Sequence, residues 1–87
     1  MKLMKLSKPG CLPCVHLSNH LEQCGVEYEE VNLMVNPEVA MEYGVMGNPV
    51  LLLLDDEGKE LDRVLGFNLE DTSKVDLLLT KLKGANV

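Results

Sequence analysis

Residues 7–14 read Ser-Lys-Pro-Gly-Cys-Leu-Pro-Cys, which places two thiols, Cys11 and Cys14, three residues apart. Side chains at positions i and i+3 of a helix are neighbours at roughly 5–6 Å, a spacing that suits a disulfide. If a strand gives way to a helix here, the first sulfur lies among unpaired backbone N–H groups at the positive end of the helix dipole. That setting favours the reactive thiolate. The stretch therefore predicts a dithiol that exchanges electrons with other disulfides.

The bulk composition is that of one small acidic domain, which we predict over residues 1–87. A formal charge of −6 argues against nucleic-acid and anionic-membrane partners. Three cysteines are an odd number, which argues against the disulfide framework of a secreted protein. The longest apolar run, residues 50–54, is too short to span a bilayer, and the first residues do not form a signal peptide. We expect a cytoplasmic protein in a reducing compartment.

The charge is spread unevenly along the chain. Residues 1–21 contain Lys2, Lys5 and Lys8 and no acid, whereas all 14 acidic residues follow. Chance alone is one explanation of this asymmetry. The other is that the local basic charge adds a second effect favouring the Cys11 thiolate.

Hydrophobic periodicity and turn residues predict seven elements in the order β-α-β-α-β-β-α. The expected segments are a strand over 2–7, a helix with Cys14, Leu17, Leu21 and Cys24 on its apolar face, a strand over 27–33, a helix from Asn36-Pro37 to Gly44, strands over 50–54 and 61–65 around a polar turn, and a helix from Asn68 to Gly84. Asn36 is expected to cap the second helix, and Asn68, with Asp71 three residues on, the last. The prediction is an α/β fold, with a four-stranded mixed sheet flanked by three helices.

Three separated stretches resemble the thioredoxin and glutaredoxin superfamily, whose fold has this element order. Residues 7–11 are similar to the glutaredoxin approach to the active site, and residues 43–49 to the thioredoxin stretch that leads into a cis-proline. Gly66-Phe67 resembles a pair in the glutaredoxin-like electron donors of ribonucleotide reductase. The resemblance implies the thioredoxin fold over essentially the whole chain and a cis bond before Pro49. It also implies protein disulfides as substrates, with ribonucleotide reductase as a candidate.

Departures from these families bear on the reductant. Pro13 directly precedes the second cysteine, as in thioredoxins, but Gly10 replaces the thioredoxin tryptophan. The first strand has no acid, so the carboxylate that thioredoxins bury beneath the second cysteine has no counterpart. Residues 47–49 and 66–71 differ from the glutaredoxin segments that hold glutathione, although Lys8 matches a glutaredoxin lysine. We therefore expect a thioredoxin-type reductase rather than glutathione as the electron source.

The helix position and the resemblance together assign roles to nine residues. Cys11 is expected to be the nucleophile and Cys14 the resolving thiol, which attacks the mixed disulfide. The expected substrate-binding residues are Lys8, Leu12, Pro13, Asn48, Pro49, Gly66 and Phe67. For Leu12, a substrate contact and a merely tolerated side chain both stay open. We expect no cofactor and a monomeric protein.

Two alternatives stand beside the thioredoxin-like thiol–disulfide oxidoreductase. One is a glutathione-dependent glutaredoxin. The other, from a different class, is a metal or iron–sulfur module that uses Cys11 and Cys14 as ligands, against which the lack of further Cys-x-x-Cys pairs speaks. His16, His20 and Cys24 also lie along one helix, but no converging ligand is evident, so we predict no metal. Both histidines are expected to be exposed, and Cys24 to be structural or, as a second reading, regulatory.

Overall fold

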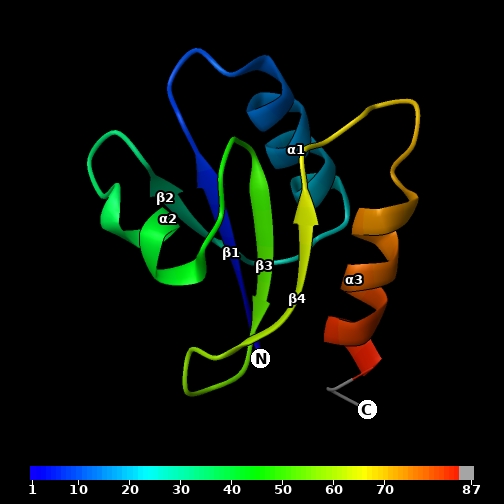
Figure 1. Cartoon of the computed structure of the whole chain (residues 1–87). Helices are drawn as coiled ribbons and strands as arrows, with labels where there is room; N and C mark the ends of the chain where they lie inside the picture. Colours follow the sequence, from blue (N-terminus) through cyan, green and yellow to red (C-terminus); the bar gives the residue numbers. More distant parts are fainter. Residues whose placement is uncertain (85–87) are drawn as a thin grey trace.

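The computed structural model describes residues 1–84, and its element order is the predicted β-α-β-α-β-β-α (Figure 1). The domain predicted over residues 1–87 is thus described as far as Gly84. The elements are β1 (Lys2–Ser7), α1 (Leu12–Gln23), β2 (Glu29–Asn32), α2 (Glu38–Tyr43), β3 (Val50–Leu54), β4 (Glu60–Leu65) and α3 (Ser73–Gly84). Within the described residues, no helix is long and apolar enough to cross a membrane.

The four strands form one mixed sheet in the order β2-β1-β3-β4. The β1–β2 pair is parallel and the β1–β3 and β3–β4 pairs are antiparallel, which makes the sheet mixed, as predicted. Leu6 near the end of β1 pairs with Val50 at the start of β3, which pairs in turn with Leu65 at the end of β4. The loops after β1, before β3 and after β4 therefore meet at one end of the sheet.

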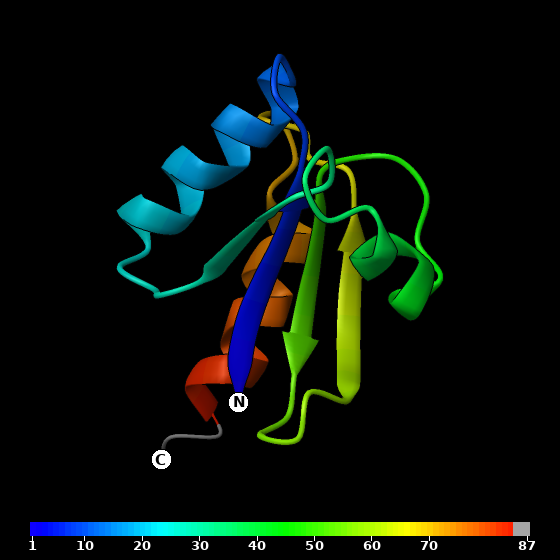
Figure 2. The same cartoon turned by 90° about the vertical axis from the view of Figure 1, so that its left-hand side faces the viewer.

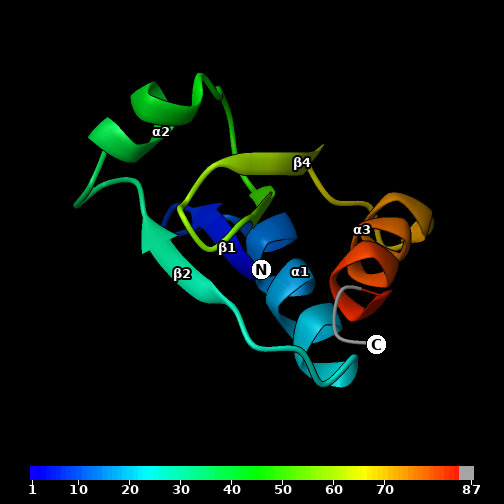
Figure 3. The same ribbon diagram turned by 90° about the horizontal axis from the view of Figure 1, so that it is seen from below.

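Helices cover both faces of the sheet, with α1 and α3 on one side and α2 on the other (Figures 2 and 3). The central strand β3 is buried along its whole length, as its continuous apolar sequence predicts. Its residues alternate between two cores. Leu51 and Leu53 pack with α1 and α3, whereas Val50, Leu52 and Leu54 face the α2 side.

Two helix starts differ from the prediction. Helix α2 begins after Pro37, and no side chain caps its first turn, so the capping role predicted for Asn36 is wrong. Helix α3 begins only at Ser73, because Asn68 pairs with Asp71 in an isolated bridge instead of opening the helix. Gly44 ends α2 as predicted, in the left-handed conformation (φ 63°) that glycine adopts without strain.

Candidate redox site

Cys11 and Cys14 form a disulfide at the start of α1, with their Cα atoms 5.2 Å apart. Cys11 is the N-cap residue and is partly exposed, and its Sγ accepts a hydrogen bond from the backbone N–H of Cys14 at 3.1 Å. Cys14 lies on the apolar face of the helix and is only 3% exposed. Pro13 stands in the first turn, where its missing N–H removes no helical hydrogen bond. Cys11 is thus the partly exposed cysteine of the pair, and Cys14 is the buried one.

A second loop reaches the disulfide from the sheet. The Asn48–Pro49 peptide bond is cis, which confirms the prediction made from the resemblance. The Nδ2 amide of Asn48 donates a hydrogen bond to Cys14 Sγ at 3.5 Å. The N–H of Gly66 donates to the Pro49 carbonyl at 2.8 Å, so the loop after β4 also joins the site. Three segments that are distant in sequence therefore meet around one disulfide.

The apolar residues predicted to bind substrate differ in exposure. Leu12 is 63% exposed, whereas Pro49 is buried and Phe67 is partly buried against the core. Two further exposed apolar side chains lie in the loops before β3 and after β4, where Met46 is 92% exposed and Leu69 59%.

Lys8 is exposed in the loop between β1 and α1. It lines two separate shallow hollows. One, of ≈ 380 Å³, lies between Lys8 and the end of β2. The other, of ≈ 260 Å³, lies on the α2 side of the sheet, and its lining residues are Lys8, Leu33, Pro37, Ala40, Val45, Met46 and Gly47.

Lys5 is buried, whereas the other lysines of the basic stretch, Lys2 and Lys8, are exposed. Its side chain is 1% exposed, and its ammonium group contacts Ser18 of α1 and Glu30 of β2. The hydrogen bond from Lys5 is the main cause that holds the pKa of Glu30 below its ordinary value of 4.5. Ser7 donates a further hydrogen bond to the same Glu30 oxygen at 3.2 Å. The charge of Lys5 is therefore neutralised locally.

The Lys5–Glu30 pair is a feature that sequence reasoning missed. Ser18 lies four residues after Cys14, so the ammonium group of Lys5 lies under the middle of α1. The sequence indicated Lys5 only as part of the basic stretch of residues 1–21. The available signal was the alternation of β1, in which Lys5 falls between Leu3 and Ser7 on the face that α1 covers.

The histidines of α1 were predicted to be exposed, and this is wrong for both His16 and His20, which are partly buried. The side chain of His20 is 19% exposed, and Nε2 lies 2.8 Å from Asp76 Oδ1 on α3. Its ring also packs against Phe67, with ring centroids 5.6 Å apart. Cys24 is a free thiol, partly buried against the core as the helical pattern predicted, and His16 is partly buried.

Comparison with known proteins places this geometry in a family. The family model described as Glutaredoxin matches residues 3–52. The SPbeta prophage-derived thioredoxin-like protein YosR of Bacillus subtilis is 45% identical over 83 residues, which cover 95% of this chain and 100% of that protein. The chain belongs to the thioredoxin/glutaredoxin superfamily. It is a thioredoxin-like redox protein with a Cys-x-x-Cys disulfide.

Other members of the superfamily agree with this assignment. The thioredoxin of Chlamydia caviae is 39% identical over 67 residues, which cover 71% of this chain and 65% of that protein. The crystal structure of Fasciola hepatica thioredoxin has a TM-score of 0.75 at 26% identity, covering 91% of this chain and 77% of that one. Thioredoxin 1 of Thermosipho africanus has a TM-score of 0.70 at 21% identity, covers both chains fully and supports the fold alone. The predicted thioredoxin fold is therefore confirmed.

Proposed function

We propose that this protein is a thiol–disulfide oxidoreductase that reduces protein disulfides as a cytosolic monomer. Cys11 is the nucleophile and Cys14 the resolving thiol. The observation that carries the proposal is the unequal exposure of the two cysteines, because Cys11 is partly exposed and Cys14 is 3% exposed. A substrate disulfide reaches Cys11 first, and Cys14 is held close enough to complete the exchange.

The chemistry follows from thiol–disulfide exchange. The Cys11 thiolate attacks one sulfur of a substrate disulfide, and the other substrate sulfur leaves as a thiolate. Cys14, once deprotonated, then attacks Cys11 Sγ and releases the second substrate thiolate. Two electrons pass to the substrate, whose thiolates take up two protons, and the Cys11–Cys14 disulfide closes. A separate reductant returns two electrons to reopen it.

The surroundings of the disulfide favour a protein substrate. The exposed side chains of Leu12, Met46 and Leu69 offer apolar contacts around a sulfur that is open to solvent. The backbone of Asn48, beside Cys14, is the expected partner for an extended substrate segment that pairs as a strand does. Pro13 restricts the turn between the two cysteines.

The segment after β4 supports a protein reductase over glutathione as the electron source. In the glutaredoxins that this chain resembles, the corresponding segment holds a carboxylate of glutathione. The N–H of Glu70 is already donated to Asn68 Oδ1 at 2.9 Å, and that of Asp71 to the Asn68 carbonyl at 3.1 Å. The carboxylate of Asp71 lies in the same turn, where hydrogen bonds from Ser73 hold its pKa below the ordinary value and keep it negative. An incoming carboxylate would therefore meet repulsion and few donors.

The division of labour between the cysteines is tested by trapping. Cys14→Ser should accumulate mixed disulfides with a disulfide substrate such as insulin, because the second attack is lost. Non-reducing electrophoresis and mass spectrometry measure the adduct. Cys11→Ser is the matched control and should form no adduct with that substrate. Parent-rate turnover by Cys14→Ser would contradict the two-thiol mechanism.

A further inference from the structure

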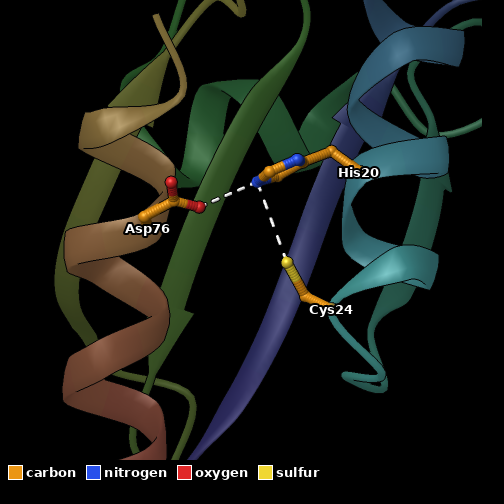
Figure 4. Close-up of side chains that lie close together, drawn as sticks. All are labelled: His20, Cys24 and Asp76. Carbon is orange, nitrogen blue, oxygen red and sulfur yellow. Dashed lines mark hydrogen bonds and ion pairs between the residues drawn. The ribbon is translucent and has the colours of Figure 1, made fainter.

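Three side chains that the redox chemistry does not use converge between α1 and α3 (Figure 4). His20 and Cys24 come from one end of α1, and Asp76 comes from the first turn of α3. Asp76 Oδ1 lies 2.8 Å from His20 Nε2, and Cys24 Sγ lies 3.8 Å from the same nitrogen. All three ligand atoms fall within 4.8 Å of one another.

Asp76 and Cys24 both contact the same ring nitrogen of His20, which excludes a hydrogen-bonded Cys-His-Asp relay. In a Cys-His-Asp relay the thiol and the carboxylate contact opposite nitrogens of the imidazole. Here both face Nε2. One nitrogen carries at most one proton, so it cannot donate to Asp76 and accept from the Cys24 thiol at the same time. A cation placed among the three atoms would use a lone pair from each of them.

The spacing and chemistry of these atoms fit zinc. Zn²⁺ binds nitrogen and oxygen at about 2.0–2.2 Å and sulfur at about 2.3 Å, so tetrahedral ligands lie roughly 3.3 Å (N to O) and 3.6 Å (N to S) apart. The observed N–O separation of 2.8 Å is shorter than this value and the N–S separation of 3.8 Å slightly longer, with all three atoms within 4.8 Å of one another, so small side-chain adjustments bring them to the zinc distances. We propose that His20, Cys24 and Asp76 form a site for Zn²⁺ or a similar divalent cation, separate from the redox pair.

Charge and proton balance favour this occupant. The Cys24 thiolate and the Asp76 carboxylate together neutralise a divalent cation. Binding replaces the thiol proton of Cys24, which passes to solvent. His20 coordinates through Nε2 as the neutral tautomer that carries its proton on Nδ1, so the contact between His20 and Asp76 becomes a pair of metal–ligand bonds. A solvent molecule completes the tetrahedron, as at zinc sites with three protein ligands.

Neighbouring groups hold the ligands in place. Thr72 Oγ1 donates to the second oxygen of Asp76 at 2.8 Å, which orients the carboxylate, and Phe67 packs against the His20 ring. Cys24 lies ten residues after Cys14 along α1, roughly 15 Å away at the helical rise, so the site is separate from the disulfide. A bound cation would tie the end of α1 to α3.

The test uses Co²⁺ as a spectroscopic probe of the full-length protein with its Cys11–Cys14 disulfide closed. A thiol assay first confirms one free thiol per chain. We expect one Co²⁺ per chain with a thiolate charge-transfer band, displaced by Zn²⁺, and a higher Tm with Zn²⁺. Cys24→Ser should abolish the band. Because loss of an outer-shell partner already costs about 10–100-fold in affinity, His20→Gln and Asp76→Asn should each weaken binding at least tenfold.

The controls separate this site from non-specific binding. His16→Gln changes the other histidine of α1 and should leave Co²⁺ affinity unchanged. The Cys11→Ser/Cys14→Ser double variant should keep the band, because its only thiol is Cys24. Circular dichroism checks that each variant is folded. Absence of the band from the parent, its persistence in Cys24→Ser, or equal weakening by His16→Gln and His20→Gln would overturn the proposal.

Discussion

Asn48 is the residue through which the cis-proline loop touches the buried sulfur. Its amide donates to Cys14 Sγ at 3.5 Å, and a donor in this position favours the thiolate form of Cys14 once the disulfide opens. The sequence predicted Asn48 as a substrate-binding residue. In the proposed mechanism, its contact with Cys14 Sγ also acts on the second step of the exchange.

Asn48→Ala should therefore slow the attack of Cys14 on a mixed disulfide. The expected loss is about fivefold, which corresponds to roughly 1 kcal/mol for a weak hydrogen bond to sulfur. Single-turnover measurement of substrate release from the Cys11 adduct gives this rate. Asn19→Ala, an exposed change on α1, is the matched control. Equal release rates for the parent and Asn48→Ala would remove Asn48 from the mechanism.

At the scale of elements, the Lys5–Glu30 pair joins β1, β2 and α1. Lys5 contributes a buried ammonium group, Glu30 a carboxylate that is 50% exposed, and Ser18 the contact to the helix. Breaking a buried ion pair from one side is costly because the remaining charge stays out of water. The half-exposed position of Glu30 reduces this cost, since water reaches the site.

Glu30→Gln should lower the free energy of unfolding by about 1–2 kcal/mol at pH 7, because the ~1.5–3 kcal/mol of a hydrogen bond to a charged group is reduced by solvent at the half-exposed Glu30. Because the pKa of Glu30 is lowered in the folded state, its contribution is present above 4.5 and is lost as pH falls through the folded value. The difference in the free energy of unfolding between the parent and Glu30→Gln should therefore shrink at acidic pH. Urea unfolding at several pH values measures this, with the exposed Glu29→Gln as control. A difference that does not change with pH would contradict the assignment.

The sequence predicted the order and type of the helices and strands, but not the residues at which α2 and α3 begin. The apolar run of residues 50–54 and the spacing of Cys14, Leu17 and Leu21 depend on local periodicity, which the fold preserves. Asn36 and Asn68 are residue types that suit turns as well as helix caps. Asn68 accepts hydrogen bonds from the N–H groups of Glu70 and Asp71 in a local turn, and no side chain caps α2.

Contacts between residues that are far apart in the sequence could not be predicted from it either. Lys5 and Glu30 are 25 positions apart, and His20 and Asp76 are 56 apart. Both pairs depend on strand register and helix packing, which local patterns do not specify. The disulfide was predictable because its two cysteines lie within one helical turn.

At the scale of the whole molecule, the choice of reductant depends on which partner fits the surface around Cys11. We expect the oxidised protein to be reduced faster by a thioredoxin-type flavoprotein reductase than by millimolar glutathione, because the turn at residues 68–71 uses its own N–H groups. Coupled NADPH oxidation at matched pH measures both rates. Lys8→Gln should slow reduction by glutathione only if glutathione docks at Lys8. Equal or faster reduction by glutathione would assign a glutaredoxin activity to this protein.

Strand β3 supplies side chains to both cores, and this has a consequence for hydrogen exchange. Neither layer of helices can separate from the sheet without exposing residues of β3, such as Leu51 on one face and Leu52 on the other. The amides of β3 should therefore exchange only through global unfolding, with one common opening free energy. Helix α2, which has six residues and buries none fully, should exchange through cheaper local openings. Native-state deuterium exchange should show slow exchange for the amides of β3 and faster, independent exchange for those of α2.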